Sequence, residues 1–247
     1  MAFQLYRLEN GNYVTTEFRD LDDKAFWCKL GNDKEDAFVK LAEKHPFGHS
    51  IAIHPAKAAD PYHPDLLVDG KDIGEVKIKN SPLFFGRKYG VDPQYALTMD
   101  LKDSFNYCRW LAKGIDIRIF AWVKWEAHRM ECHGKTYTVE PMGGVWMASF
   151  SDLRKKETSK NPPEIHWYKE NFRQPTEHCG DGWETELITF DPRLEIENRG
   201  AIQVAKNITS KGFWVSEGVR YPSGHSSGSY VFDLGDTTLF QRLQFKK

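Results

Sequence analysis

The stretch HPDLLVDGKDIGEVKIKN, residues 63–80, decides how the first half of this chain is expected to fold. Two apolar segments flank an Asp-Gly dipeptide at positions 69 and 70, and this pair favours the tight turn of a β-hairpin. In the second segment Glu75 and Lys77 project from the same side of a strand, while Val76 between them packs into the opposite side. The stretch therefore predicts an antiparallel hairpin with one charged face and one apolar face.

Asp65 is expected to approach Glu75 across this hairpin. Nine residues lie between them, enough for a strand, the turn and half of a returning strand. The carbonyl of Val76 lies near the Glu75 carboxylate, so two carboxylates and one carbonyl form a hard-oxygen site that suits Mg²⁺ or Mn²⁺. An adjacent lysine, Lys77, can hold or help deprotonate the attacking water, or stabilise charge that develops at phosphorus. The implied reaction is metal-assisted phosphodiester hydrolysis.

The segments around this hairpin alternate between helical and strand patterns. Pro46 and Gly48 end the first helix, and the second has Asp92 as N-cap and Gly114 as stop. In chain order we expect a strand pair over 3–17 turning at Asn10-Gly11, a helix over 32–45, a strand over 50–54, the two strands of 63–80, a loop over 81–90, a long helix over 92–113 and a buried strand over 115–125.

Pro64, Asp65, Glu75 and Lys77 have the spacing of a known motif, and the expected elements follow the order α-β-β-β-α-β. In both respects the chain resembles the PD-(D/E)XK nuclease superfamily, which includes type II restriction endonucleases, archaeal-type Holliday junction resolvases and many phage nucleases. The resemblance covers about residues 31–126. It implies an α/β fold with a restriction-endonuclease-like core, a mixed sheet flanked by helices, in which Asp65 and Glu75 bind the metal and Lys77 is the catalytic lysine.

The resemblance also implies an acidic residue on the first core helix that reaches the metal. Glu35, in the stretch GNDKE, is the candidate, and Asp36 is its rival. The expected metal ligands are therefore Asp65, Glu75, the carbonyl of Val76 and Glu35, with Mg²⁺ as the cofactor and Mn²⁺ as a substitute. The alternative is a solvated hairpin face on which Glu75 and Lys77 form an ordinary surface pair.

Beyond about Glu126 the pattern changes to short aromatic-rich strands separated by Gly, Pro and charged loops, with no further helix expected. We therefore divide the chain into residues 1–126, which hold the N-terminal strands and the nuclease core, and a β-rich C-terminal extension over 127–247. The extension is a candidate second surface for DNA.

Basic residues in two segments are candidates for contacting DNA phosphates. In residues 77–88 they alternate with Phe84 and Phe85, which either stack on bases or pack under the following helix. Residues 151–174 also mix lysines and arginines with aromatics, as expected of a DNA-contacting lobe or of a charged surface loop. The candidate DNA-binding residues are Lys79, Arg87, Lys88, Lys155, Lys156 and Lys160.

Other patterns are less specific. The pairs Cys132-His133 and His178-Cys179 could ligate Zn²⁺, but the usual spacing between zinc ligands is absent, so core thiols and surface histidines are the default interpretation. His54 and His63 flank the hairpin as auxiliary bases or as solvated side chains. Motifs typical of ATPases, dinucleotide enzymes, zinc proteases and serine hydrolases do not occur.

The composition is that of an ordinary globular protein. The chain has 247 residues with 34 Lys and Arg against 35 Asp and Glu, which excludes a disordered, collagen-like or disulfide-scaffold protein. The four cysteines form no CxxC pair, which favours free thiols and a cytoplasmic location. We also expect no signal peptide and no membrane insertion, because no segment has the required apolar length.

The sequence thus predicts a metal-dependent deoxyribonuclease, expected to be an endonuclease. A homodimer is plausible by analogy, because cutting two strands needs two sites. Two alternatives remain open: a DNA-binding protein with a nuclease-like fold that does not cleave, and an α/β protein in which the motif is fortuitous.

Overall fold

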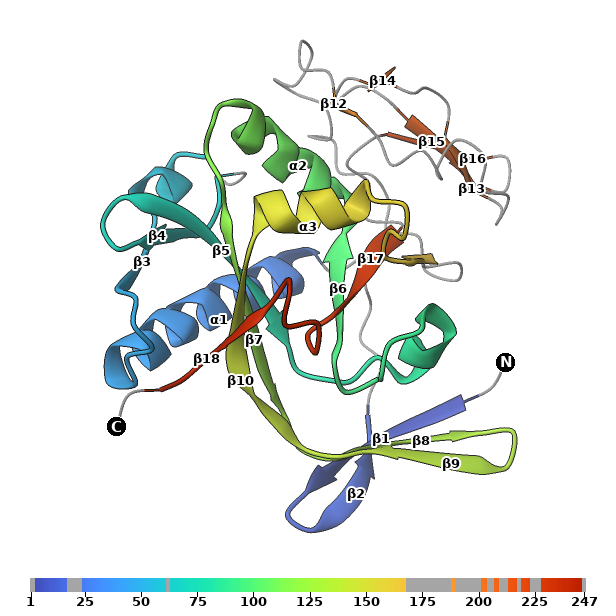
Figure 1. The fold of residues 1–247 in the computed structure, drawn as a ribbon. Helices are drawn as coiled ribbons and strands as arrows, with labels where there is room; N and C mark the ends of the chain where they lie inside the picture. Colours follow the sequence, from blue (N-terminus) through green and yellow to red (C-terminus); the bar gives the residue numbers. More distant parts are fainter. Residues whose placement is uncertain are drawn as a thin grey trace. The chain divides into compact units, whose positions relative to one another are not determined.

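A computed structural model shows a mixed α/β protein with a mixed sheet and few helices (Figure 1). It describes residues 3–16, 24–60, 63–167, 188–189, 201–203, 207–208, 213–216, 219–222 and 228–245. The chain divides into two compact units. The first contains Met1–Leu97, Ile117–Ser149 and Val231–Lys247, and the second contains Thr98–Asp116 and Phe150–Tyr230.

In the first unit, the described residues form two sheets, one long helix and two short 3₁₀ helices. In chain order they are β1 (Phe3–Glu9), β2 (Asn12–Thr15), α1 (Lys24–Lys44), β3 (Ile51–Ile53), η1 (Pro55–Ala58), β4 (Leu66–Val68), β5 (Asp72–Lys79), η2 (Phe84–Tyr89), β7 (Arg118–Trp125), β8 (His128–Cys132), β9 (Lys135–Val139), β10 (Met142–Ser149) and β18 (Gln241–Leu243).

The described residues of the second unit form two helices and several short strands. They are α2 (Leu101–Ala112), α3 (Phe150–Glu157), β11 (Ile165–Trp167), β12 (Ile188–Thr189), β13 (Ala201–Gln203), β14 (Asn207–Ile208), β15 (Phe213–Ser216) and β16 (Val219–Pro222). Two strands, β6 (Ala96–Asp100) and β17 (Gly228–Asp233), begin in one unit and end in the other.

The six-stranded sheet of the first unit has the order β18-β10-β7-β5-β4-β3. Strands β3, β4 and β5 form an antiparallel meander, whereas β5 and β7 are parallel, with Glu75 opposite Ile119. A parallel pair needs a long crossover, and the chain supplies one between residues 80 and 117. Figure 1 shows α1 lying against this sheet. The expected elements therefore occur in the expected order, but with the additional strand β6 before α2 and with α2 in the second unit.

The core of this unit lies between α1 and the sheet. Phe38 on the helix is fully buried, and its ring centroid lies 5.8 Å from that of Phe120 and 5.8 Å from that of Trp122. The buried cluster also contains side chains from β3, β4, β5, β10 and β18: Ile51, Leu66, Val68, Val76, Val145 and Leu243. Aromatic packing thus holds the described part of α1 against the middle strands of the sheet.

Both expected hairpins are confirmed, and both turn through a residue pair with positive φ. Asn10 and Gly11 have φ of 49° and 82°, and Asp69 and Gly70 have φ of 53° and 70°. Asn, Asp and Gly adopt this left-handed region most readily, which explains why these dipeptides mark the turns. The pKa of Asp69 is lowered first by a hydrogen bond with His49, and the Ser50 N–H also donates to its carboxylate.

The helix expected over 92–113 needs correction, because residues 92–100 form a turn and strand β6. The Asp92 carboxylate accepts a hydrogen bond from the Gln94 N–H at 2.8 Å, so it caps a turn and not a helix. Along β6, Ala96, Leu97 and Met99 are buried, and the sheet order places this strand beside β17. Pairing with a strand more than 120 residues away is a tertiary effect that overrides the local helical pattern.

The C-terminal half also differs from the prediction. A helix, α3, occurs where only strands and loops were expected, and the boundary at residue 126 does not separate the units. Strand β8 pairs with β1 and β10 pairs with β7 over eight residues, so both belong to the first unit. In addition, α1 begins at Lys24 and not near residue 32. Strands β8 and β10 extend sheets that contain strands from before residue 126, and the sequences of β8 and β10 do not indicate these partners.

The packing of α1 gives a first prediction. Replacing Phe38→Ala removes a fully buried ring, so we expect the free energy of unfolding to fall by roughly 3–5 kcal/mol in urea denaturation. The matched control is Tyr137→Ala, because Tyr137 is 42 % exposed and its loss should cost less than about 1 kcal/mol. Equal losses in the two variants would contradict the packing described for this helix.

Candidate metal centre

The antiparallel pairing of β4 and β5 brings Asp65 and Glu75 together. Leu66 pairs with Gly74, so Asp65, one residue before β4, comes opposite Glu75. The Asp65 N–H donates to Glu75 Oε2 at 3.4 Å, and the Val76 N–H donates to Asp65 Oδ2 at 3.5 Å. The register expected from the sequence is thus confirmed. The metal role assigned to the Val76 carbonyl stays a prediction, whereas its N–H has a defined contact.

The alternation along β5 separates charged from apolar side chains as expected. Val76 is buried in the core against α1. On the other side of the strand Lys77 Nζ lies 2.8 Å from Glu75 Oε1, and the two side chains are only 19 % and 13 % exposed. Because both charges are largely removed from solvent, this is not an ordinary surface ion pair.

Glu35 on α1 is brought to the same place, but through a residue that the sequence did not indicate. The ammonium group of Lys57 makes ion pairs with Glu35 Oε2 and with Asp65 Oδ1. These three side chains are between 12 % and 17 % exposed. The structure therefore brings together the four residues predicted from the sequence and adds Lys57 to them. The four are Glu35, Asp65, Glu75 and Lys77. Asp36, the rival of Glu35, is exposed and makes no ion pair that the structure shows at this cluster.

Lys57 belongs to η1, in the segment that connects β3 to β4. The His54 side chain accepts a hydrogen bond from the Ala56 N–H at 3.2 Å and so caps this short helix. The His54 N–H donates to the Asp65 carbonyl at 2.8 Å, and the ring stacks on His63 at a centroid distance of 4.0 Å. The two histidines thus organise the segment that carries Lys57, and their alternative role as auxiliary bases stays a prediction.

Burial and charge act on the ionisation of this cluster. Burial raises the pKa of Asp65, and the neighbouring Glu35 carboxylate raises it further, while Lys57 and Lys77 act in the opposite direction. For Lys57, burial lowers the pKa, but hydrogen bonds and charges from Asp65 and Glu35 outweigh this effect and leave the pKa raised. Burial first, and then the charge of His63, lower the pKa of His54. The carboxylates of Asp65 and Glu35 therefore stabilise the protonated, positively charged form of Lys57.

The donor set fits a hard divalent cation in its chemistry. Glu35, Asp65 and Glu75 offer only carboxylate oxygens, the ligands that Mg²⁺ and Mn²⁺ prefer. Among the described residues, however, no group of three or more His, Cys, Asp or Glu side chains is already arranged around a common point. The ammonium of Lys57 lies between two of the carboxylates, so a metal held by these residues requires that side chain to move.

Of the candidate DNA-binding residues in the first unit, Arg87 and Lys88 are exposed on η2. Lys88 Nζ lies 5.8 Å from the centroid of the half-buried Phe85 ring, and Leu83 packs against the cluster around Val91. Lys79, in contrast, is half-buried, and burial lowers its pKa to about 8. Arg87 and Lys88 are therefore better placed to reach a phosphate than Lys79.

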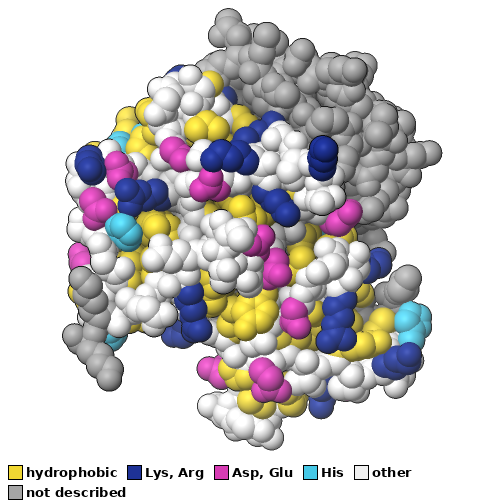
Figure 2. All heavy atoms as spheres, in the orientation of Figure 1, with side chains coloured by type: hydrophobic (Ala, Val, Ile, Leu, Met, Phe, Trp, Pro, Cys, Tyr) yellow, Lys and Arg dark blue, Asp and Glu magenta, His cyan; other side chains and the backbone are white. Residues whose placement is uncertain are grey.

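Lys155, Lys156 and Lys160 lie in the second unit, on α3 or just after it. Lys155 is exposed and pairs with Asp152 at 2.7 Å. On the same helix Arg154 pairs at 2.8 Å with Glu157, which is fully buried and also accepts a hydrogen bond from Ser104. The start of the segment 151–174 is therefore a helix and not a charged loop, and its contact with DNA stays a prediction. Figure 2 shows basic and acidic side chains intermixed on the described part of one face.

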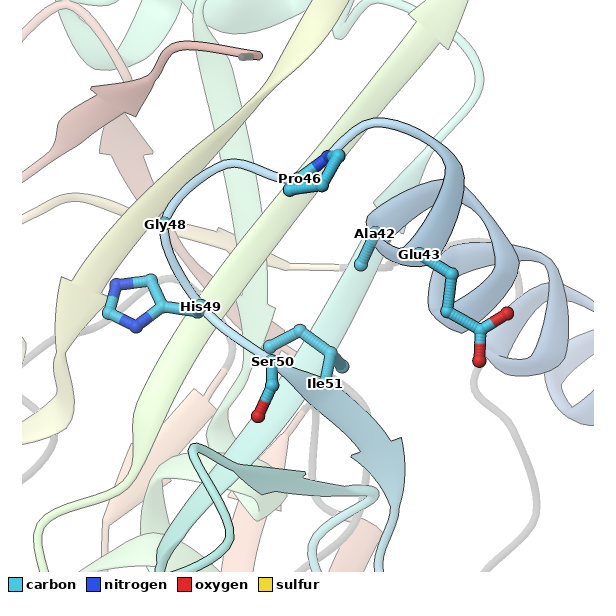
Figure 3. A pocket seen from close by; sticks show the side chains of 7 residues that line it. All are labelled: Ala42, Glu43, Pro46, Gly48, His49, Ser50 and Ile51. Atoms are coloured by element: carbon cyan, nitrogen blue, oxygen red, sulfur yellow. The ribbon is translucent and has the colours of Figure 1, made fainter.

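A pocket of about 540 Å³ lies elsewhere in the first unit, between the end of α1 and the start of β3 (Figure 3). Within the described chain, Glu35, Asp65, Glu75 and Lys77 are not among its lining residues, which are Ala42, Glu43, Pro46, Gly48, His49, Ser50 and Ile51. His49 already pairs with Asp69 at 2.8 Å on the neighbouring turn. We therefore assign this pocket no role in the chemistry.

The zinc interpretation is not tested, because only one of its two Cys-His pairs lies in the described residues. Cys132 is a free thiol at the end of β8, and His133 follows in the turn to β9 with φ of 50°. His178 and Cys179 lie outside the described residues. Cys108 is also free, and burial raises the pKa of its thiol to about 11.

Comparisons with protein-family models, with curated protein sequences and with solved structures find no match to this chain. None of the helices in the described part combines the length and apolar character needed to cross a membrane. The function must therefore be argued from the geometry of the site.

The register of the site gives a second prediction, because it depends on the absence of a side chain at Gly74. A Cβ there would lie 2.8 Å from Val68 Cγ2 and 3.3 Å from the Arg118 carbonyl oxygen. We expect Gly74→Ala to lower the free energy of unfolding by roughly 1–3 kcal/mol. At Gly143, on β10, a Cβ would meet its nearest atom only at 4.0 Å, so Gly143→Ala is the matched control. Urea denaturation checks both, and equal stability would refute the close packing at Gly74.

Proposed function

We propose that this protein is a metal-dependent deoxyribonuclease, an endonuclease with a restriction-endonuclease-like core. The observation that carries the proposal is the pairing of β4 with β5, which sets Asp65 beside Glu75 and leaves Lys77 on the same side of the strand. Two acidic groups and a lysine with little exposure to solvent are energetically costly to bury. Such groups occur preferentially at functional sites. This combination suits phosphodiester hydrolysis.

The topology around the site supports the same proposal. The elements α1, β3, β4, β5, α2 and β7 occur in the helix-strand order of the PD-(D/E)XK nucleases, with β6 as an additional strand before α2. The first three strands form a meander, and β7 joins the third in parallel. Glu35 on the first helix reaches Asp65 through Lys57, in line with the acidic helix residue that the resemblance implies. Motif, strand order and helix residue are three separate points of agreement.

In the proposed site each side chain has a distinct task. Asp65, Glu75 and Glu35, together with the Val76 carbonyl, would hold Mg²⁺ or Mn²⁺, which when bound polarises a phosphate oxygen and lowers the pKa of a coordinated water. Lys77 is held beside Glu75, so its ammonium can orient the attacking water and offset negative charge that develops on the phosphate. Exposed Arg87 and Lys88 would bind the DNA backbone irrespective of its sequence.

Cleavage assays test the proposal. Purified protein is incubated with supercoiled, linear, single-stranded and four-way-junction DNA in Mg²⁺, Mn²⁺ or EDTA. We expect cutting only with metal, and a fall of at least about 100-fold in Glu75→Gln and in Lys77→Met, because each removes a group at the reacting centre. The matched control is Asp72→Asn on the same strand, where the carboxylate pairs with Arg118 at 2.5 Å.

The outcomes separate the proposal from its alternatives. Cutting that persists at the wild-type rate in Glu75→Gln would rule out this site as the catalytic centre. Binding of DNA without cutting in any metal would instead identify a DNA-binding protein with a nuclease-like fold. An Asp72→Asn variant as inactive as Glu75→Gln would show that loss of a carboxylate on β5 damages the fold and not the chemistry.

DNA binding gives a separate prediction. Reversing two exposed charges with Arg87→Glu and Lys88→Glu should weaken binding and reduce the slope of log K against log salt concentration by about 2, one unit for each phosphate that the protein no longer neutralises. Fluorescence anisotropy in EDTA measures this without cleavage. The control reverses two exposed lysines on α1, Lys40→Glu and Lys44→Glu, and should leave the slope unchanged. Equal slopes for the two double variants would exclude η2 as a DNA contact.

A further inference from the structure

Lys57 is the feature of this site that neither the motif nor the proposed reaction explains. Its ammonium group makes ion pairs with Glu35 and Asp65, two of the three carboxylates assigned to the metal. The Lys57 side chain is 17 % exposed, similar to its two partners. A positive charge carried by the chain itself therefore lies between the groups that a divalent cation needs.

The backbone around Lys57 keeps this charge close to the site. The Lys57 N–H donates to the His54 carbonyl at 3.0 Å, and the Asp60 N–H donates to the Ala56 carbonyl at 2.9 Å. The His54 N–H in turn donates to the Asp65 carbonyl, which fastens the start of η1 to the strand that follows the site. The segment is thus attached at its start to Asp65, so the Lys57 ammonium can leave the carboxylates by a change of side-chain rotamer.

An ammonium group and a divalent cation cannot occupy the same space between two carboxylates, and their like charges repel. We propose that Lys57 is a tethered cation that competes with the divalent metal for Glu35 and Asp65, so that the metal binds only when the Lys57 side chain leaves. This inference rests on the metal site of the proposed function and adds that Lys57 regulates whether the metal is bound there. Lys57 also relieves the repulsion between the two buried carboxylates whenever it pairs with them.

The size of the effect follows from the share of molecules in which Lys57 holds the site. A ligand that binds only one of two states has an apparent dissociation constant raised by the inverse of the fraction in the competent state. If Lys57 pairs with the carboxylates in about nine of ten molecules, apparent metal affinity is about tenfold weaker than the affinity of the open site. Removing the ammonium should therefore tighten metal binding.

The test is a titration of the full chain with Mn²⁺, followed by calorimetry or by the electron paramagnetic resonance of free Mn²⁺. We expect Lys57→Met to bind Mn²⁺ at least about tenfold more tightly than the wild type, because Met has a similar length but no charge. The gain should persist in about 0.5 M salt, since exposed charges far from the site are screened there within about 5 Å. The matched control is Lys40→Met, in which an exposed lysine of α1 is neutralised.

Thermal stability gives a second readout that does not depend on activity. In EDTA we expect Lys57→Met to melt at a lower temperature than the wild type, because Glu35 and Asp65 then face each other without the ammonium group. Addition of Mn²⁺ should raise its melting temperature by more than it raises that of the wild type. The variant Lys57→Gln serves if Lys57→Met fails to fold, because its amide can still donate a hydrogen bond to a carboxylate.

Mn²⁺ binding to the neutral variants that is no tighter than to the wild type, or weaker, would overturn the inference. The nuclease proposal would stand in that case, because it is decided by metal-dependent cutting in the wild type and its loss in Glu75→Gln. Absence of Mn²⁺ binding in every variant would also overturn the inference, and absence of cutting as well would overturn both. Tighter binding in Lys57→Met without cutting of any DNA would support the inference for a metal site of another function.

Discussion

The tight turn between β4 and β5 is the constraint on which the rest of the site depends. Side chains alternate along a strand, so a register shift of one residue would turn Glu75 and Lys77 into the core and expose Val76. The turn at Asp69 and Gly70 prevents such a shift: both have positive φ, and His49 and Ser50 bind the Asp69 carboxylate. Gly74 lets Val68 and the Arg118 backbone approach closely. The position of Asp65 against Glu75 follows from this geometry.

The second constraint is electrostatic. Glu35, Asp65 and Glu75 are largely removed from solvent, and unpaired charges in such a place are strongly unfavourable. Two lysines, Lys57 and Lys77, compensate three carboxylates, and burial together with the Glu35 charge still raises the pKa of Asp65. The three carboxylates offer the oxygen ligands that a hard cation prefers, which is why a divalent cation is the ligand proposed for them.

The candidate site was more predictable from the sequence than the fold around it. Glu75 and Lys77 share a face because they are two residues apart, and Asp65 meets Glu75 because the turn is short; both are local rules. Glu35 was found only through the family resemblance. Lys57 was not predicted as a site residue because a lysine in a Pro-Ala segment carries no local signal. Its partners come from α1 and from the residue before β4. Strand β6 was not predicted because Asp92 resembles a helix N-cap, so the helix was expected to begin there.

The sequence by itself determined both hairpins, the alternation of charge along β5 and the apolar side of α1, since each depends on backbone preferences and periodicity within a few residues. Only the tertiary structure decided that β10 extends the sheet beside β7, that β8 joins β1, and that Lys57 lies between Glu35 and Asp65. The physical reason is that pairing of distant strands and the neutralisation of buried charges depend on which side chains meet in space, and residues far apart in the chain supply them.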